Sequence, residues 1–195
     1  IPGFYDDALA ASQEHARRTG AEFAHAFDLP EVVAGAGTCA LEIATQVPEV
    51  DTLLVAVGGG GLIAGVASWF RDRARVVGVE TTGTPTLHAA RSAGEPVQVE
   101  VSGIAVSALG AARIGDIAWE AAQRWVDESL LIEDDDVRGA QQWLWETARV
   151  VAEPAGATPI AALLSGAYVP AANETVVALI SGANTSPGSV ANSQP

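Results

Sequence analysis

A short apolar segment followed by four consecutive glycines constrains the fold of this chain more than any other feature. Residues 52–57 are aliphatic and rich in β-formers, which predicts a strand buried on both faces. After the glycines at 58–61, residues 62–70 are apolar and predict a helix, and residues 76–79 predict the next strand. This order indicates a βαβ unit whose glycine loop lies at the carboxyl edge of a parallel sheet, where open α/β folds bind ligands.

The rest of the chain continues this alternation of helices and strands. Gly20 is expected to close the first helix in a left-handed conformation, and Thr38 to cap the second. The helix that starts at aspartates 134–136 has an apolar face formed by Val137, Ala140, Leu144, Ala148 and Val151. The pattern predicts an α/β fold with a mainly parallel sheet, in one domain over residues 1–195. We expect helices at residues 5–19, 39–46, 62–70, 84–93, 116–125, 157–164 and from 134 onward, and strands at 21–25, 52–57, 76–79, 126–132 and 175–180.

Composition excludes several classes of protein. With 195 residues and 49% hydrophobic side chains, the chain can bury a core, which argues against a disordered or fibrous protein. Ten basic against 24 acidic residues give a net charge of -14, which repels nucleic acid. No apolar run is long enough to span a membrane, and the lone Cys39, expected in the core, has no partner for an internal disulfide. We therefore expect a cytoplasmic protein that binds neither nucleic acid nor membrane.

Lysine and methionine are both absent from the chain. All ten basic residues are arginines, and the first residue is Ile1. Because translation starts with methionine, this first residue is expected to be a boundary within a longer protein, with a further segment upstream.

The glycine loop has the features of a phosphate site. Without Cβ atoms, the backbone N–H groups of residues 58–61 can converge on an anion, and the amino terminus of the following helix adds partial positive charge. The competing interpretation is a tight turn without a ligand. The spacing differs from the dinucleotide motif GxGxxG, and the loop lacks the lysine and the serine or threonine of a Walker motif. A phosphate-bearing ligand of another kind is the better interpretation.

Six sequence blocks then point to one family. In order and spacing they resemble those of the pyridoxal-phosphate-dependent serine/threonine dehydratases, which include threonine ammonia-lyases and serine racemases, and the resemblance covers residues 4–187. It implies the tryptophan-synthase-β-like fold of type II, a mainly parallel twisted sheet flanked by helices. By this resemblance the chain is most of the large cofactor-binding domain, and the N-terminal segment and the small domain are missing. The blocks are Gly35-Ala36-Gly37-Thr38 with Leu41-Glu42-Ile43, residues 57–66 around the four glycines, Val77-Gly78-Val79-Glu80, Ser102-Gly103-Ile104-Ala105-Val106, residues 151–157, and Ile180-Ser181-Gly182-Ala183-Asn184.

The resemblance also implies which residues hold pyridoxal 5'-phosphate. Gly103 would lie beside the pyridine ring, Ser181 would hydrogen-bond the ring nitrogen, and Glu153 would lie near the ring. The alternatives are an ordinary loop serine for Ser181 and a helix-capping carboxylate for Glu153. The residues that would bind the phosphate are Gly58, Gly59, Gly60, Gly61 and Leu62.

Glu80 resembles the family's ligand for a divalent cation. Relatives carry an aspartate a few residues further on, whereas this chain has Thr84, Pro85 and Thr86 there. A solvated or hydrogen-bonded strand end is therefore the favoured interpretation of Glu80, and a monovalent cation is a further alternative. His15, His25 and His88 have no metal-ligand spacing and are expected at the surface or in the core.

The residue that would carry the chemistry is absent. The family's Schiff-base lysine lies in an upstream motif, so no catalytic residue is assigned in this chain. By the resemblance, a complete enzyme would be a homodimeric lyase that deaminates a small amino-acid substrate, L-threonine or L-serine, to a 2-oxo acid and ammonia. The alternatives are an amino-acid racemase or β-replacing enzyme of the same fold, and a non-catalytic fragment that binds phosphate.

Overall fold

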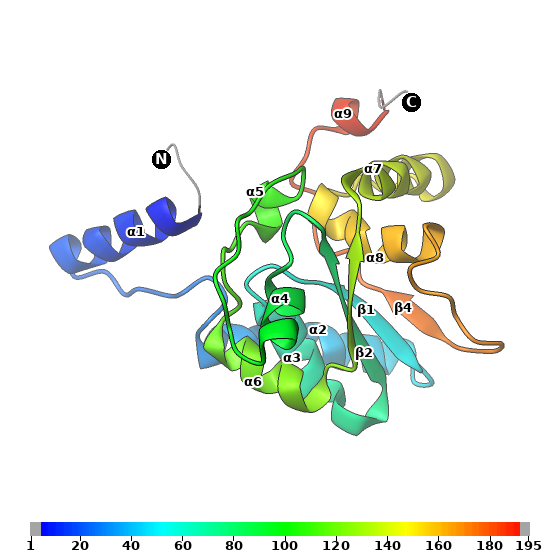
Figure 1. Cartoon of the computed structure of the whole chain (residues 1–195), viewed down its shortest axis with the longest axis horizontal. Coiled ribbons are helices and arrows are strands. Elements are labelled where there is room, and N and C mark those ends of the chain that lie inside the picture. Colours follow the sequence, from blue (N-terminus) through cyan, green and yellow to red (C-terminus); the bar gives the residue numbers. More distant parts are fainter. Residues whose placement is uncertain (1–4, 192–195) are drawn as a thin grey trace.

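A twisted parallel sheet forms the centre of the molecule (Figure 1). The computed structural model describes residues 5–191, apart from the side chains of Asp6 and Ala191. Within this part of the chain four strands pair in the order β3-β2-β1-β4, and every pair is parallel. The predicted α/β fold is confirmed. The strands are β1 (Thr52–Ala56), β2 (Arg75–Thr81), β3 (Glu128–Ile132) and β4 (Val176–Ala178).

Helices cover both faces of the sheet. Alternate residues of a strand point to opposite faces, so Leu53 and Val55 of β1 pack into one core cluster and Leu54 packs into the other. The first cluster also contains residues of α2 (Pro30–Gln46), α3 (Gly61–Phe70), α4 (Thr86–Ala93) and α6 (Asp116–Trp125). Residues of α7 (Asp134–Trp143) and α8 (Pro154–Leu164) fill the second.

The two apolar strands at residues 52–57 and 175–180 differ in burial. All five residues of β1 are buried, as predicted. The residues of β4 are only half-buried, because among residues 5–191 this strand pairs on one side only, with β1. The strand predicted at residues 175–180 is thus present over Val176–Ala178, but the expectation from its apolar residues that it is buried was wrong.

The segment before β1 departs from the predicted pattern. Helix α2 begins at Pro30 rather than at residue 39, because proline suits the first turn of a helix, where its missing N–H needs no partner. Thr38 lies inside this helix, so it is no N-cap, and its hydroxyl donates to the Gly35 carbonyl. Residues 21–25, predicted as a strand, form neither strand nor helix, and Cys39 is exposed rather than in the core.

Glycines within α2 and α3 explain why α2 includes residues 35–37, where the sequence predicted a loop. A Cβ atom on Gly65 would lie 2.5 Å from the backbone nitrogen of Gly37, so the two helices approach closely at these positions. Residues 36 and 37 therefore make a helix-packing contact with Gly65, although glycine in a sequence usually indicates a loop.

Helix α7 ends earlier than its apolar pattern predicts. A wider π turn, η2 (Leu144–Ala148), follows Trp143 and is closed by Arg149 in a left-handed conformation with φ 57°. Ala148 is consequently exposed, and Val151 lies beyond the helix. The remaining short elements are η1 (Arg71–Arg73), α5 (Val106–Leu109) and α9 (Pro187–Ala191).

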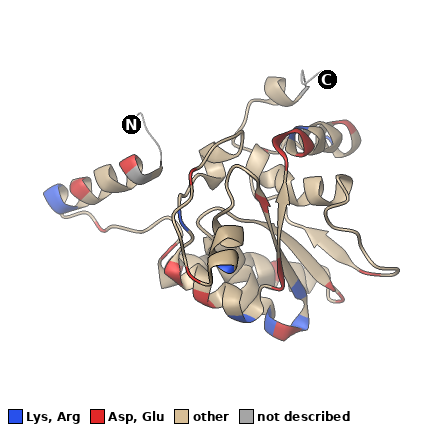
Figure 2. Cartoon of the chain, viewed as in Figure 1, with Lys and Arg blue, Asp and Glu red and all other residues tan. Residues whose placement is uncertain are grey.

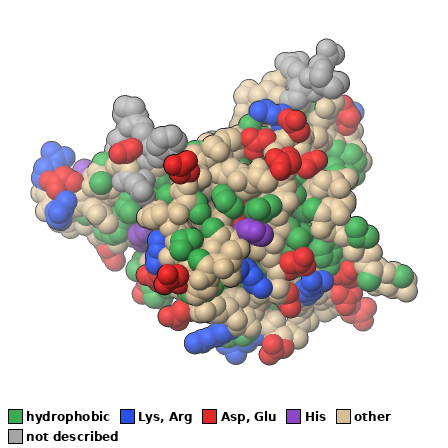
Figure 3. Space-filling model, viewed as in Figure 1, with side chains coloured by type: hydrophobic (Ala, Val, Ile, Leu, Met, Phe, Trp, Pro, Cys, Tyr) green, Lys and Arg blue, Asp and Glu red, His purple; other side chains and the backbone are tan. Residues whose placement is uncertain are grey.

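Helix α1 (Tyr5–Thr19) projects from the body of the molecule, with charged side chains near its far end (Figure 3). Its bounds are those predicted, and Gly20 closes it at φ 73° by donating its N–H to the Ala16 carbonyl. Within residues 5–191, no helix combines the length and apolar character needed to cross a membrane.

Candidate cofactor site

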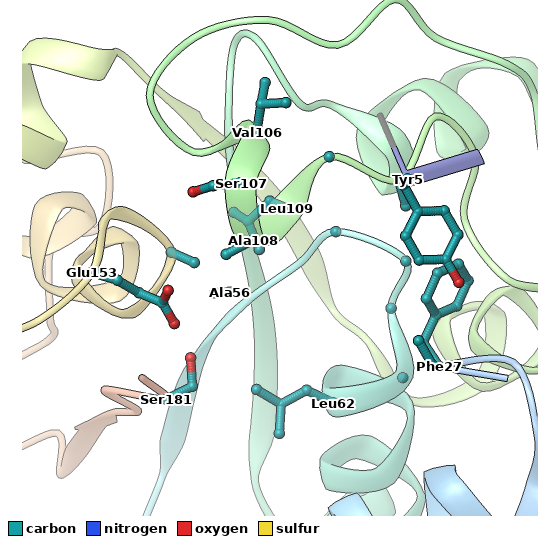
Figure 4. A pocket seen from close by; sticks show the side chains of 18 of the residues that line it. Tyr5, Phe27, Ala56, Leu62, Val106, Ser107, Ala108, Leu109, Glu153 and Ser181 are labelled. Carbon is teal, nitrogen blue, oxygen red and sulfur yellow. The ribbon is translucent and has the colours of Figure 1, made fainter. Parts of the chain in front are cut away.

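A pocket of about 730 Å³ opens at the carboxyl ends of two neighbouring strands, β1 and β4. The glycine loop after β1 and Ser181 after β4 both line it, together with Glu153 at the start of α8 and residues of α5 (Figure 4). A volume of this size suits a small organic cofactor. The two loops singled out from the sequence therefore face one common cavity.

Close backbone packing requires the glycines of this loop. A Cβ atom on Gly58 would lie 2.8 Å from the Leu109 Cα, and one on Gly61 would lie 2.9 Å from the Phe27 Cα. Gly60 has φ 88°, and a Cβ there would lie 2.6 Å from that of Ala118. The loop accordingly runs in a narrow channel between neighbouring segments, and side chains at these positions would displace it.

Hydrogen bonds fix the orientation of three successive peptide groups in the loop. The Gly58 carbonyl accepts from Thr86 Oγ1 at 2.5 Å, the Gly59 carbonyl from Gly115 N–H at 3.0 Å, and the Gly60 carbonyl from Ala64 N–H at 2.9 Å. In a trans peptide the carbonyl and the following N–H point in opposite directions. The N–H groups of residues 59–61 are therefore directed away from these partners, and all three residues line the pocket.

Helix α3 adds to this arrangement. Its N-cap residue is Gly60, which provides no side-chain cap. The first N–H groups of a helix lack acceptors within the helix and carry partial positive charge, so an anion at this position is stabilised. No arginine lines the described pocket, and Glu153 is its one charged residue. The arginine-bearing segment 71–75 leads into the amino end of β2 and so lies at the opposite end of the strands, on the lower side in Figure 2. Backbone amides would therefore hold a bound phosphate.

Glu153 and Ser181 lie on the same wall of the pocket (Figure 4). Glu153 N–H donates to the Gly182 carbonyl at 3.0 Å, and a Cβ on Gly156 would lie 2.5 Å from that carbonyl oxygen. Helix α8 and the loop after β4 are thus packed tightly, which brings the carboxylate and the hydroxyl together. Glu153 occupies the N-cap position of α8, but its side chain makes no capping hydrogen bond. Its carboxylate faces the pocket instead.

Among the pocket residues that the sequence analysis missed, three have aromatic or polar side chains. The rings of Tyr5 and Phe27 lie on the opposite wall, with their centroids 5.3 Å apart, and Ser107 of α5 points toward the side of Glu153 (Figure 4). Ser107 directly follows the recognised block at 102–106, which was the available signal. Phe27 carries no such signal, because its place over the glycine loop depends on the path of a segment without regular structure.

Leu62 lines the pocket, whereas Gly103 does not appear in the described lining. Gly103 has φ 87°, and a Cβ there would lie 2.6 Å from Asp134 Oδ2. The next N–H, of Ile104, donates to the same oxygen at 3.0 Å. The geometry therefore explains this glycine by its close approach to Asp134, and contact with a cofactor remains a prediction.

Glu80 lies outside the pocket and is fully buried, so of the two predicted forms of this strand end the solvated one was wrong and the hydrogen-bonded one is confirmed. Its oxygens accept hydrogen bonds from the N–H groups of Leu87 at 2.7 Å and His88 at 2.8 Å, and from Ser129 Oγ at 2.7 Å. Burial raises the pKa of Glu80 to about 7, while these donors act in the opposite direction. Within residues 5–191 no three histidine, cysteine or acidic side chains cluster as metal ligands. The contacts of Glu80 are those of a hydrogen-bonded carboxylate.

The chain belongs to a family of enzymes that use pyridoxal phosphate. Residues 1–182 match the family described as "Pyridoxal-phosphate dependent enzyme". The fold is that of type II enzymes of this kind, as the sequence blocks predicted. The glycine loop fits the phosphate of such a cofactor, and the pocket has the size and the polar wall for its ring.

Particular relatives narrow this assignment. The chain is 36% identical over 181 residues to an L-threonine ammonia-lyase of Geobacter sulfurreducens, covering 91% of this chain and 45% of that protein. Among solved structures, maize serine racemase superimposes with a TM-score of 0.88 at 28% identity, covering 96% of this chain and 59% of that one. The processed form of threonine deaminase isoform 2 from Solanum lycopersicum superimposes with a TM-score of 0.86 at 28% identity. The match covers 95% of this chain and 55% of that one. The chain thus spans about half the length of these proteins.

Proposed function

We propose that this chain is part of a pyridoxal-phosphate-dependent dehydratase that deaminates L-threonine or L-serine to a 2-oxo acid and ammonia. The observation that carries the proposal is the shared pocket of the glycine loop and Ser181, at the ends of adjacent parallel strands. Similarity to an L-threonine ammonia-lyase supports the choice of reaction. The complete protein would be a cytoplasmic homodimer.

Each pocket residue has a distinct proposed role. The amides of residues 59–61 bind the phosphate and so anchor the cofactor. The Ser181 hydroxyl hydrogen-bonds the pyridine nitrogen as a neutral partner, so that nitrogen needs no proton. Glu153 borders the ring and orients groups near it, and Gly103, by the family resemblance, lies beside the ring. When bound, the cofactor supplies an electron sink for the α-carbon of the amino acid.

The base that removes the α-proton is proposed to lie outside this chain. Lysine is the residue that attaches this cofactor covalently in the family, and this chain has none. We therefore assign the lysine-bearing segment and the small domain to an upstream part of the same protein. N-terminal sequencing and intact-mass measurement of the purified protein test this assignment directly, because the mass of this chain alone is 19.9 kDa.

The reaction is tested on the full-length protein loaded with pyridoxal phosphate. We expect equal amounts of 2-oxo acid and ammonia from L-threonine or L-serine, and at least a tenfold loss of activity in Ser181→Ala. Ser165→Ala, a matched change at an exposed serine after α8, is expected to retain activity. Formation of D-serine without 2-oxo acid would instead establish a racemase. Cofactor binding without turnover of any amino acid would establish a non-catalytic protein.

A further inference from the structure

The hydroxyl of Thr86 connects helix α4 to the first residue of the glycine loop. Thr86 is fully buried, and its Oγ1 donates to the Gly58 carbonyl at 2.5 Å. The nearest oxygen of Glu80 lies farther away, at 3.3 Å from the same hydroxyl. A hydroxyl has one hydrogen to donate, so the shorter contact indicates that the Gly58 carbonyl receives it.

Glu80 holds the first turn of α4, which carries Thr86. The N-cap residue of this helix, Pro85, provides no side-chain cap. The carboxylate of Glu80 reaches from β2 to accept the N–H groups of Leu87 and His88, and Ser129 of β3 donates to it as well. The position of Thr86 is therefore set by the sheet.

The hydrogen bond at Gly58 differs from the other two bonds that hold the loop. The Gly59 and Gly60 carbonyls accept from backbone N–H groups, whereas the Gly58 carbonyl accepts from a side chain. The peptide between Gly58 and Gly59 is trans and planar, so fixing its carbonyl also fixes the direction of the Gly59 N–H. One side chain thus fixes the orientation of one amide in the loop that lines the pocket.

We propose that Thr86, held in place by Glu80, is a positioning residue that aims the Gly59 N–H at the phosphate of the bound cofactor. The inference rests on the proposed cofactor site but adds a residue outside the pocket lining. Without the hydroxyl, the Gly58 carbonyl loses this partner, and one constraint on the orientation of the peptide is removed. The amide then spends less time in the orientation that binds an anion.

The test compares two buried threonines in the full-length protein. Thr86→Val keeps the shape of the side chain and removes the hydroxyl, and we expect about a tenfold weaker affinity for pyridoxal phosphate, as for one lost hydrogen bond to an anion. Affinity for pyridoxal, which has no phosphate, is expected to stay unchanged, and Thr86→Ser is expected to restore binding. The control is Thr84→Val, because Thr84 is equally buried and its hydroxyl pairs with Thr81 instead of the loop.

Two results would overturn the proposal. One is a Thr86→Val protein that binds pyridoxal phosphate as tightly as Thr84→Val, and the other is an equal loss for pyridoxal and its phosphate. If the valine variant does not fold, isotope-labelled glycine in the wild-type protein gives the answer, since inorganic phosphate must shift the Gly59 amide resonance. A wild-type protein that binds neither pyridoxal phosphate nor phosphate would refute the cofactor site itself. If the wild type binds pyridoxal phosphate and Thr86→Val binds it equally well, only the role of Thr86 is refuted, and the cofactor site is not.

Discussion

The unit from β1 to α3 and the helix α1 were both predicted from sequence, yet they occupy opposite environments. All of β1 and most of α3 are buried, whereas most residues of α1 are exposed and the helix stands apart from the sheet (Figure 1). Its described contact with the body includes Tyr5, whose ring lies against Phe27. Isolated helices of about 15 residues are marginal in water. A helical pattern therefore fixes local structure without revealing how strongly the helix is held.

The largest expected difference between the two regions is the loss of stability when a leucine is replaced by alanine. Leu54 of β1 is fully buried, so Leu54→Ala should lower the free energy of unfolding by about 2–5 kcal/mol. Leu9 of α1 is only half-buried, and Leu9→Ala should cost less than about 1 kcal/mol, because little packing is lost and alanine favours helix. Urea unfolding of both variants measures this. Equal losses would show that α1 is packed as tightly as the sheet.

Two glycines with positive φ sharpen the comparison. Gly60 is surrounded by protein atoms, so Gly60→Ala combines a left-handed alanine with a collision and should cost about 2–4 kcal/mol. Gly20, after α1, has φ 73° and no atom within 4 Å of an added Cβ, so Gly20→Ala should cost only about 1 kcal/mol. Thermal unfolding is the measurement, and pyridoxal-phosphate binding should be lost in the first variant alone. A similar cost at both sites would contradict the packing around the loop.

Sequence patterns predicted best those helices and strands whose limits are set by residues nearby in the sequence. The run at 52–57 and the helix at 116–125 were located well, because apolar periodicity and flanking charges are read within a few residues. The start of α2 was misplaced because Gly37 serves contact with Gly65 of α3, a distant part of the sequence that the local pattern does not reveal. The burial of β4 depends likewise on its place at the sheet edge.

The site shows the same division. Gly58 to Gly61 and Ser181 could be found because each follows an apolar strand, and parallel strands bring such loops to one edge. Thr86 could not, because its hydroxyl reaches the loop across 28 positions of sequence and its own surroundings read as an ordinary helix start. Which residues hold a loop in place depends on tertiary packing.

A third prediction concerns the buried carboxylate under α4. Each oxygen of Glu80 accepts a hydrogen bond from a backbone N–H. In Glu80→Gln the side-chain NH2 group must replace one of these oxygens and face an N–H donor, which should lower the free energy of unfolding by about 1–3 kcal/mol. Glu42→Gln, at an exposed position of α2, is the matched control and should be nearly neutral. Chemical unfolding at pH 8 separates the two. A neutral Glu80→Gln would refute the capping role.

The same group predicts a pH dependence. The pKa of Glu80 is about 7 in the folded protein and near 4.5 when unfolded, so between these values the unfolded state loses its proton first. The stability that this group contributes is complete below pH 4.5 and is lost as the pH rises through 7. The unfolding free energy of the wild type, minus that of Glu80→Gln, should therefore decrease as the pH rises from 4.5 to about 7. A difference that rises with pH would mean that the donors outweigh burial.

The smallest expected effects are those of exposed ion pairs. Arg17 and Glu14 in α1 lie 2.8 Å apart with side chains 73% and 65% exposed, so their coupling should stay below about 0.5 kcal/mol. Arg75 and Glu128 join β2 to β3 at 2.7 Å and are less exposed, at 46% and 43%, so solvent screens them less and their coupling should reach about 1 kcal/mol. Double-mutant cycles to alanine, at low salt and in about 1 M salt, measure both couplings. Because the strands are already fixed by backbone pairing, the β2–β3 pair loses less side-chain freedom when it forms, and a stronger coupling in α1 would contradict this account.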